Sequence, residues 1–220
     1  MIRPAKTNKT DGLVFAAFLL LQQNLQKDII NAVALYIGNI VTERELRKGL
    51  EASILGAHTR AAGLGRILAQ NVPELTLEGK DEAFGHLTLA DQSGYLRGLA
   101  DDVVTGRYTT PENSVAPALK SRALLYARRL RGTADEAWVS EFPDDTRFLW
   151  LLGYGVEQHC EVCPMYASRS VIEPYTKHDL PPPPGSGKTP CKVNCDCRLR
   201  TVGGKSGFPF EPGSSFVLNL

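Results

Sequence analysis

Several features that would fix the class of this protein at once are missing from its sequence. The apolar run Leu13–Leu21 has nine residues, whereas a helix needs about 20 to cross a bilayer. The formal net charge is only +1, so no strong overall field draws the chain to nucleic acid. No cysteine precedes Cys160. These absences argue against a membrane protein and leave any DNA contact to a local patch.

The basic residues Arg3, Lys6 and Lys9 ahead of the apolar run suggest a secretory signal, but the sequence does not complete one. No cleavage site of the small-x-small type follows Leu21. Apolar residues instead continue at helical spacing as far as Ile37. We therefore interpret this segment as a buried amphipathic helix and expect the thiols of the protein to stay reduced.

The composition is that of an ordinary globular protein, with 43% hydrophobic and 22% charged residues among 220. This length suffices for one core, or for a helical body with a small appended module. We predict a mainly α fold in which the C-terminal module is a small cysteine-rich, zinc-binding α+β unit. The expected parts are a flexible basic arm (1–10), a helical body (11–145), the cysteine-rich module (146–202) and an extended C-terminal tail (203–220).

Helical periodicity dominates the predicted body. After the first helix, Thr42 and Glu45 form a capping box that predicts the start of the second. The spacing of apolar residues predicts a third helix over 81–104 and a fourth over 115–130. The second helix carries four glycines, each of which weakens a helix by about 1 kcal/mol, so we expect another backbone to approach there; they are Gly49, Gly56, Gly63 and Gly65.

Arginines surround the apolar stripe of the fourth predicted helix; they are Arg122, Arg128, Arg129 and Arg131. The simpler interpretation is a solvated surface. The alternative is a patch that faces phosphate or an acidic partner, since guanidinium groups bind anions in a bidentate manner. Charge reversal of Arg128, Arg129 and Arg131 would distinguish the two.

Near residue 145 the composition changes. The run from Phe148 to Leu152 predicts a short buried strand, and all five cysteines follow with the spacing C-x2-C-x27-C-x3-C-x-C. A C-x2-C pair and a second group of thiolates can complete the tetrahedral site that zinc prefers. Four thiolates close such a site, so we expect structural rather than catalytic zinc.

Tetrahedral zinc takes four ligands, and five cysteines are present. We assign Cys160, Cys163 and Cys191 first, and Cys195 and Cys197 compete for the fourth position. His159 adjoins the first pair and is the weaker candidate.

Two further patterns bear on enzymatic function. The segment from Gly185 to Thr189 resembles the end of a phosphate-binding loop, but Pro182 stands where the opening glycine is needed and no helix is expected to follow. No serine or cysteine has a recognisable base and orienting group. We therefore expect no ATP binding, and we expect a protein that is not an enzyme.

The segment Trp150–Val202 resembles the C-terminal part of minor head proteins of tailed phages, a group that includes the Mu F-like head morphogenesis proteins. The shared pattern is a C-x2-C pair, a Leu-Pro element and a closing Asn-Cys-x-Cys motif. This chain matches it at Cys160, Cys163, Leu180, Pro181, Asn194, Cys195 and Cys197.

The resemblance implies a structural protein of the virion, in the phage head or neck, which passes through the host cytoplasm during assembly. Its implied partners are the portal and the major capsid protein within a multi-subunit assembly, with a contact to DNA during packaging or ejection left open. The competing interpretation is a zinc-ribbon protein that binds nucleic acid, based on thiolate zinc and the arginine-rich helix.

Overall fold

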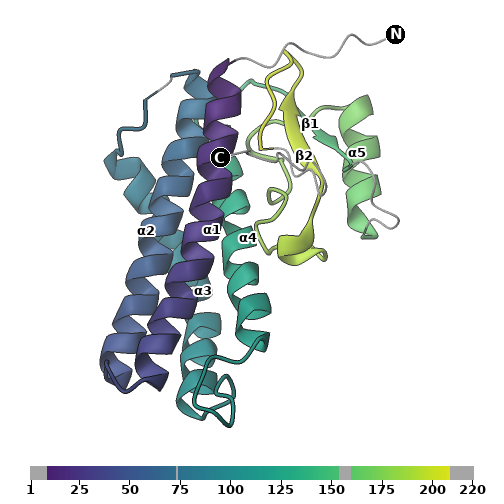
Figure 1. Ribbon diagram of the computed structural model, residues 1–220. Helices are drawn as coiled ribbons and strands as arrows, with labels where there is room; N and C mark the ends of the chain where they lie inside the picture. Colours follow the sequence, from purple (N-terminus) through teal and green to yellow (C-terminus); the bar gives the residue numbers. More distant parts are fainter. Residues whose placement is uncertain (1–8, 73, 154–159, 209–220) are drawn as a thin grey trace.

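The structure, a computed structural model, describes residues 9–72, 74–153 and 160–208. Four long helices run alternately up and down as a bundle, and a small module packs beside them (Figure 1). The bundle helices are α1 (Lys9–Ile37), α2 (Glu43–Gln70), α3 (Gly79–Val104) and α4 (Ala118–Ser140). The module contains β1 (Phe148–Leu151), α5 (Val162–Ile172), the 3-10 helix η1 (Lys192–Asn194) and β2 (Arg198–Thr201). The predicted mainly helical fold with a C-terminal cysteine cluster is confirmed.

The capping box at the start of α2 is present as the sequence predicts. The Thr42 side chain accepts a hydrogen bond from the Glu45 backbone N–H at 3.3 Å, and the Glu45 carboxylate accepts one from the Thr42 N–H at 2.8 Å. Asn71 ends α2 in the left-handed conformation, at φ 57°. These two caps satisfy backbone groups that a helix cannot pair internally.

Close backbone approach explains part of the glycine content of α2. A Cβ atom on Gly65 would lie 2.0 Å from the carbonyl oxygen of Ala134, so only glycine lets α4 pack this closely on α2. Gly49, in contrast, faces open space. The expectation of close approach therefore holds at one end of α2 and is wrong at the other.

The bundle core also contains a buried polar cluster. The two ring nitrogens of His58 contact the hydroxyl of Thr133 at 2.7 Å and the amide nitrogen of Gln92 at 2.8 Å. Burial lowers the pKa of His58 to about 3, with a further contribution from the positive charge of Arg129. This histidine is therefore neutral and part of the packing that connects α2, α3 and α4.

The fourth predicted helix is longer than expected. It begins at Ala118 and continues through Arg131 and Gly132 to Ser140, ten residues past the predicted end. Almost every residue after Leu130 is buried in this helix. Tertiary packing therefore outweighs the low helix propensity of glycine and threonine in this stretch.

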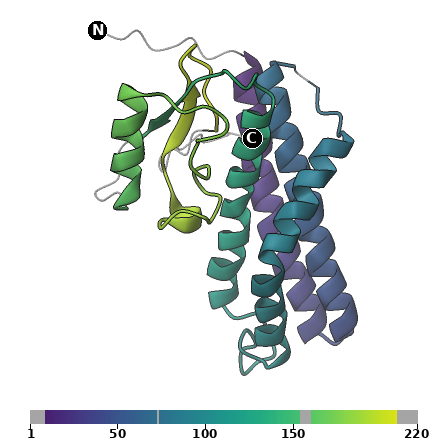
Figure 2. The same ribbon diagram turned by 180° about the vertical axis from the view of Figure 1, so that it is seen from behind.

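The module is built on a two-stranded antiparallel sheet, which confirms the predicted strand. Trp150 of β1 lies opposite Leu199 of β2, and both side chains are buried. Seen from behind, the module lies on the α4 side of the bundle, away from α2 (Figure 2). None of the helices described here is both long and apolar enough to span a membrane.

The two predicted terminal segments fall largely outside the described residues. Residues 1–8 of the expected basic arm are not described, and Lys9 already belongs to α1. Of the tail, residues 203–208 are described. Their last member, Phe208, packs on α1, with ring centroids 5.7 Å from Phe15 and 4.7 Å from Phe18. The start of the tail therefore docks on the bundle.

Candidate metal centre

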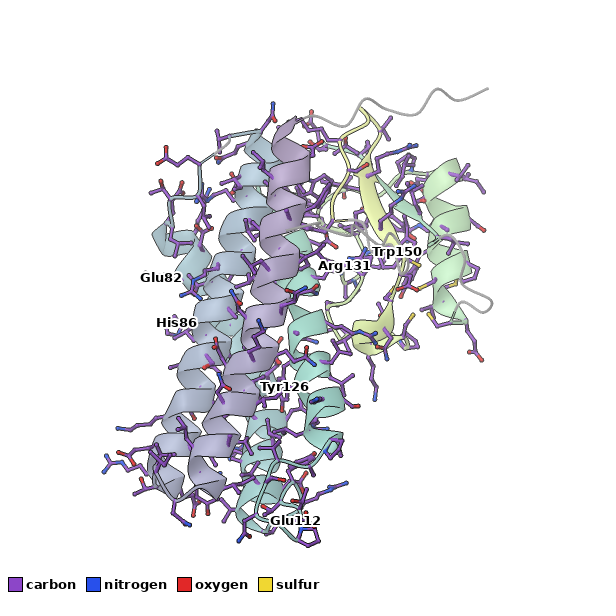
Figure 3. All side chains as sticks on the ribbon, viewed as in Figure 1. Glu82, His86, Glu112, Tyr126, Arg131 and Trp150 are labelled. Atoms are coloured by element: carbon purple, nitrogen blue, oxygen red, sulfur yellow. The ribbon has the colours of Figure 1, made fainter. Side chains whose placement is uncertain are left out.

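Five thiols from two distant segments of the module meet in one place. Cys160 lies two residues before α5, and Cys163 lies in its first turn. Cys191 and Cys195 flank η1, and Cys197 immediately precedes β2. Because β2 is held against β1, the second segment is brought back to the start of α5. The side chains of this region gather beside Trp150 in Figure 3.

The sulfur atoms form two overlapping sets of three. The Sγ atom of Cys163 lies 3.1 Å from that of Cys160, 3.5 Å from that of Cys191 and 3.8 Å from that of Cys195. Cys160 and Cys191 are 2.6 Å apart. The mutually close sets are Cys160, Cys163 and Cys191, and Cys163, Cys195 and Cys197, each within 4.8 Å. The cluster can therefore hold a metal ion, and Cys163 lies at its centre.

The donor set fits zinc. Zinc bonds thiolates at about 2.3 Å in a tetrahedron, which places the sulfurs about 3.8 Å from each other. The separation of Cys163 and Cys195 already has this value. The sulfurs of Cys160 and Cys191, 2.6 Å apart, would move apart by about 1 Å around an ion. Cys163, Cys195 and Cys197 are buried, while Cys160 and Cys191 are half-buried. A metal bound here would be largely shielded from water.

The electrostatics of the cluster favour a cation. Hydrogen bonds from Cys163 and Cys195 lower the pKa of Cys197 to about 2. Hydrogen bonding to Cys195 and Cys197 raises the pKa of Cys163, which remains a thiol that donates its proton. Buried thiols this close cannot all ionise while they repel one another. A divalent cation would remove that restriction and let the thiolates serve as ligands.

Arg131 connects this centre to the bundle. From α4, its guanidinium group donates hydrogen bonds to the backbone carbonyl oxygens of Cys195 at 2.7 Å, of Phe208 at 2.9 Å and of Cys197. Figure 3 shows Arg131 at the edge of α4 that faces the module. Arg131 is buried, with 2% exposure. Its contacts fix the backbone on which two of the cysteines lie.

Asp135, one turn further along α4, completes this connection. Its carboxylate lies 3.6 Å from the guanidinium group of Arg131 and accepts a hydrogen bond from the backbone N–H of Phe208 at 3.0 Å. Burial raises the pKa of Asp135 to about 7, although the charge of Arg131 and the hydrogen bond from Phe208 act in the opposite direction. The sequence interpretation missed this pair, which its spacing of four residues could have indicated.

The Gly-Ser-Gly-Lys segment packs on α4. A Cβ atom on Gly132 would lie 2.3 Å from the Cα atom of Ser186, so glycine is required on α4 for the segment to approach. Gly185 and Gly187 have φ values of 76° and 75°, which glycine adopts without strain. The ammonium group of Lys188 lies 3.2 Å from Asp91 on α3. These glycines and this lysine therefore attach the module to the bundle.

The arginines do not form one solvated patch. Arg131 is buried and bonded as described, so both sequence interpretations are wrong for it. Arg129 lies 3.7 Å from Asp91 and packs on Gly187, and Arg128 hydrogen-bonds to the side chain of Asn194. Three of the four arginines therefore connect α4 to other parts of the molecule. The fourth, Arg122, lies near the start of α4. This outcome reflects the docking of the module, which helical periodicity alone cannot show.

The remaining ligand candidate, His159, lies outside the described residues. The chain matches no protein-family model, no curated protein and no solved structure.

Proposed function

We propose that the cysteine cluster binds one structural zinc ion through Cys160, Cys163, Cys191 and Cys195. The observation that supports this proposal is the central position of Cys163, whose sulfur lies within 3.8 Å of the other three. The bound metal holds the start of α5 against the segment that leads into β2. Its binding energy then contributes to the folding of a module that has only a short two-stranded sheet.

Cobalt substitution tests the ligand set. Tetrahedral Co²⁺ bound by four thiolates gives a strong sulfur-to-metal charge-transfer band whose intensity follows the number of thiolates. We expect Cys197→Ser to keep the band of the natural protein, and Cys195→Ser to lose about a quarter of it. A loss of about a quarter in Cys197→Ser with an unchanged band in Cys195→Ser would reverse the assignment of the fourth ligand. Absence of bound zinc or cobalt in the natural protein would reject the proposal.

We further propose that the chain is an assembly component of a tailed-phage head, present in the head or neck and in contact with the portal or major capsid protein. The order and convergence of the cysteine motif support this role. Exposed apolar side chains suited to a protein interface add support. Examples are Leu13 and Leu20 on α1, and Val171 and Ile172 at the end of α5, which are exposed by 56% to 87%.

Co-expression with candidate portal and major capsid proteins tests this role. We expect the chain to elute with one of them during size-exclusion chromatography and to be present in assembled heads. Ile172→Glu should weaken that association at least about tenfold. Leu87→Glu, at a similarly exposed position on α3, serves as the matched control. Elution of the natural chain alone, and its absence from heads, would contradict the proposal.

The alternative of a zinc-dependent nucleic-acid-binding protein has less support. It depended on the arginines of α4, and Arg128, Arg129 and Arg131 are engaged within the protein. Binding of DNA by the isolated protein with an affinity that falls steeply as salt rises would favour this alternative.

A further inference from the structure

A pocket of 380 Å³ lies at the other end of the bundle from the sheet of the module, where α4 begins. It is lined by Arg107, Tyr108, Ala118, Ser121, Arg122 and Leu125. Glu112, labelled at the lower end of Figure 3, marks the connection between α3 and α4 at this end. The pocket thus combines two guanidinium groups and a hydroxyl with an apolar wall.

Arg122 contributes a buried donor. Its Nε atom is shielded from solvent and has no hydrogen-bond acceptor among the described residues. The guanidinium group lies 6.0 Å from the ring centroid of Tyr126, and the hydroxyl of that tyrosine donates to the carbonyl oxygen of Tyr95 at 2.9 Å. The guanidinium group already interacts with the side chain of Tyr126, and a ligand acceptor reaches the unpaired Nε–H only when the Arg122 side chain turns toward the pocket. Pairing of that donor then adds to the affinity.

Arg107 lines the same pocket and is paired with an acidic residue. It donates through Nη1 to both carboxylate oxygens of Asp102, at 3.1 Å each. Its side chain is 68% exposed, so a ligand can reach it from solvent. The second guanidinium group therefore stands at the rim of the pocket, while Arg122 stands deeper.

The surroundings restrict the chemistry of the ligand. Asp101 and Asp102 at the end of α3 bring negative charge close to the rim and disfavour an extended polyanion such as a nucleic-acid backbone. A single carboxylate meets less repulsion and can pair with a guanidinium group in a bidentate manner. Tyr108, Ala118 and Leu125 offer an apolar surface for a group attached to that carboxylate.

We propose that this pocket binds a carboxylate carried next to an apolar group, as at the carboxyl terminus of a peptide that ends in an apolar residue. Arg122 and Arg107 bind the carboxylate, Ser121 donates a further hydrogen bond, and Leu125 and Tyr108 contact the apolar group. The site extends the proposed function by a second contact point for a partner protein. It depends neither on the metal nor on the proposed place in a phage head.

The test is an NMR titration of the full zinc-loaded chain, observed at the arginine Nε–H groups. N-acetyl-leucine is the probe, N-acetyl-leucinamide is its neutral counterpart, and N-acetylglycine lacks the apolar side chain. We expect N-acetyl-leucine to shift the Arg122 signal saturably. Its affinity should exceed that of the amide by at least about tenfold and also exceed that of N-acetylglycine.

Three variants complete the experiment. Arg122→Gln and Arg107→Gln should each weaken binding of N-acetyl-leucine about tenfold or more. Arg60→Gln changes the same charge at an exposed position on α2 outside the pocket and should leave binding unchanged. Arg107 is largely exposed, so its variant remains informative even if Arg122→Gln impairs folding.

Three results would overturn the proposal. These are an equal response to N-acetyl-leucinamide, binding of inorganic phosphate at least as tight as that of N-acetyl-leucine, and unchanged affinity in Arg107→Gln. The measurement involves the isolated chain without portal or capsid protein. A negative titration therefore does not contradict the proposed assembly role. A negative result for the assembly role likewise does not contradict ligand binding at the pocket.

Discussion

The guanidinium group of Arg131 lies 2.7 Å from the carbonyl oxygen of Cys195 and donates a hydrogen bond to it. One buried side chain of the bundle thereby holds the backbone beside a proposed metal ligand. Partners of this kind orient ligands, and their loss weakens metal binding. The bundle and the metal centre are consequently coupled in energy.

Replacement of Arg131 tests this coupling. Arg131→Met leaves three carbonyl oxygens without a donor and Asp135 without a cation, so we expect a loss of about 3–5 kcal/mol in unfolding free energy. Zinc affinity should fall about tenfold or more. Arg131→Lys should lose less, because it keeps the charge but cannot reach all three oxygens. Denaturant unfolding and competition with a chelator measure both quantities. Arg60→Met, at an exposed position on α2, is the control, and equal losses in it would contradict the coupling.

Removal of the metal should loosen the module before the bundle. Hydrogen exchange in the presence of a chelator should rise first in residues 160–201, because the thiolates then repel one another and only the short sheet remains. Amides of α2 around Ile54, a fully buried residue, should stay protected. A uniform rise across both regions would show that the metal centre does not act locally.

Gly132 and Gly49 form a matched pair for packing. Gly132→Ala places a Cβ atom 2.3 Å from the Cα atom of Ser186, so the backbone must move, at a cost of about 1–3 kcal/mol. Gly49→Ala meets nothing within 4 Å and should raise stability by about 1 kcal/mol through better helix propensity. Thermal unfolding measures the direction of the stability change in each variant. Equal changes in the two variants would show that the close approach of Ser186 does not affect stability.

His58 and Asp135 should give opposite pH dependence. The pKa of His58 falls from 6.5 to about 3 on folding, so its contribution is complete above pH 6.5 and is lost as pH falls through that range. The pKa of Asp135 rises from 3.8 to about 7, so its contribution is complete below pH 3.8 and is lost as pH rises. Each can change stability by up to about 1.4 kcal/mol per pH unit.

Unfolding of two variants between pH 4 and pH 6.5 separates these contributions. Asp135→Asn retains His58 and should become more stable as pH rises, whereas His58→Gln retains Asp135 and should become less stable. Metal binding contributes equally to the two variants. The test is therefore the difference between the two slopes of unfolding free energy against pH. Parallel profiles would contradict the assignment of these two groups.

The sequence predicted what depends on local patterns. The Thr42 and Glu45 capping box, the helices and the strand at Phe148 follow from periodicity and neighbouring residues, and the structure confirms them. The grouping of the cysteines follows from the geometry that a metal requires. The end of α4 was missed, because the residues after Leu130 are buried against both α2 and the module, which helical periodicity does not reveal.

The arginines of α4 show the limit of pattern interpretation. On a helix with no known neighbour, Arg131 is indistinguishable from an exposed arginine. Its burial depends on Phe208, 77 residues away. Such contacts depend on how two parts of the chain dock, which no local spacing encodes.

The packing of Phe208 on Phe15 and Phe18 joins the last described residue to the first helix. During synthesis on the ribosome, α1 emerges well before Phe208, and this part of its apolar surface stays uncovered until the segment that carries Phe208 has been translated. Until then the aromatic rings are available to chaperones or to other nascent chains. A product that is released before Phe208 is made leaves this surface uncovered.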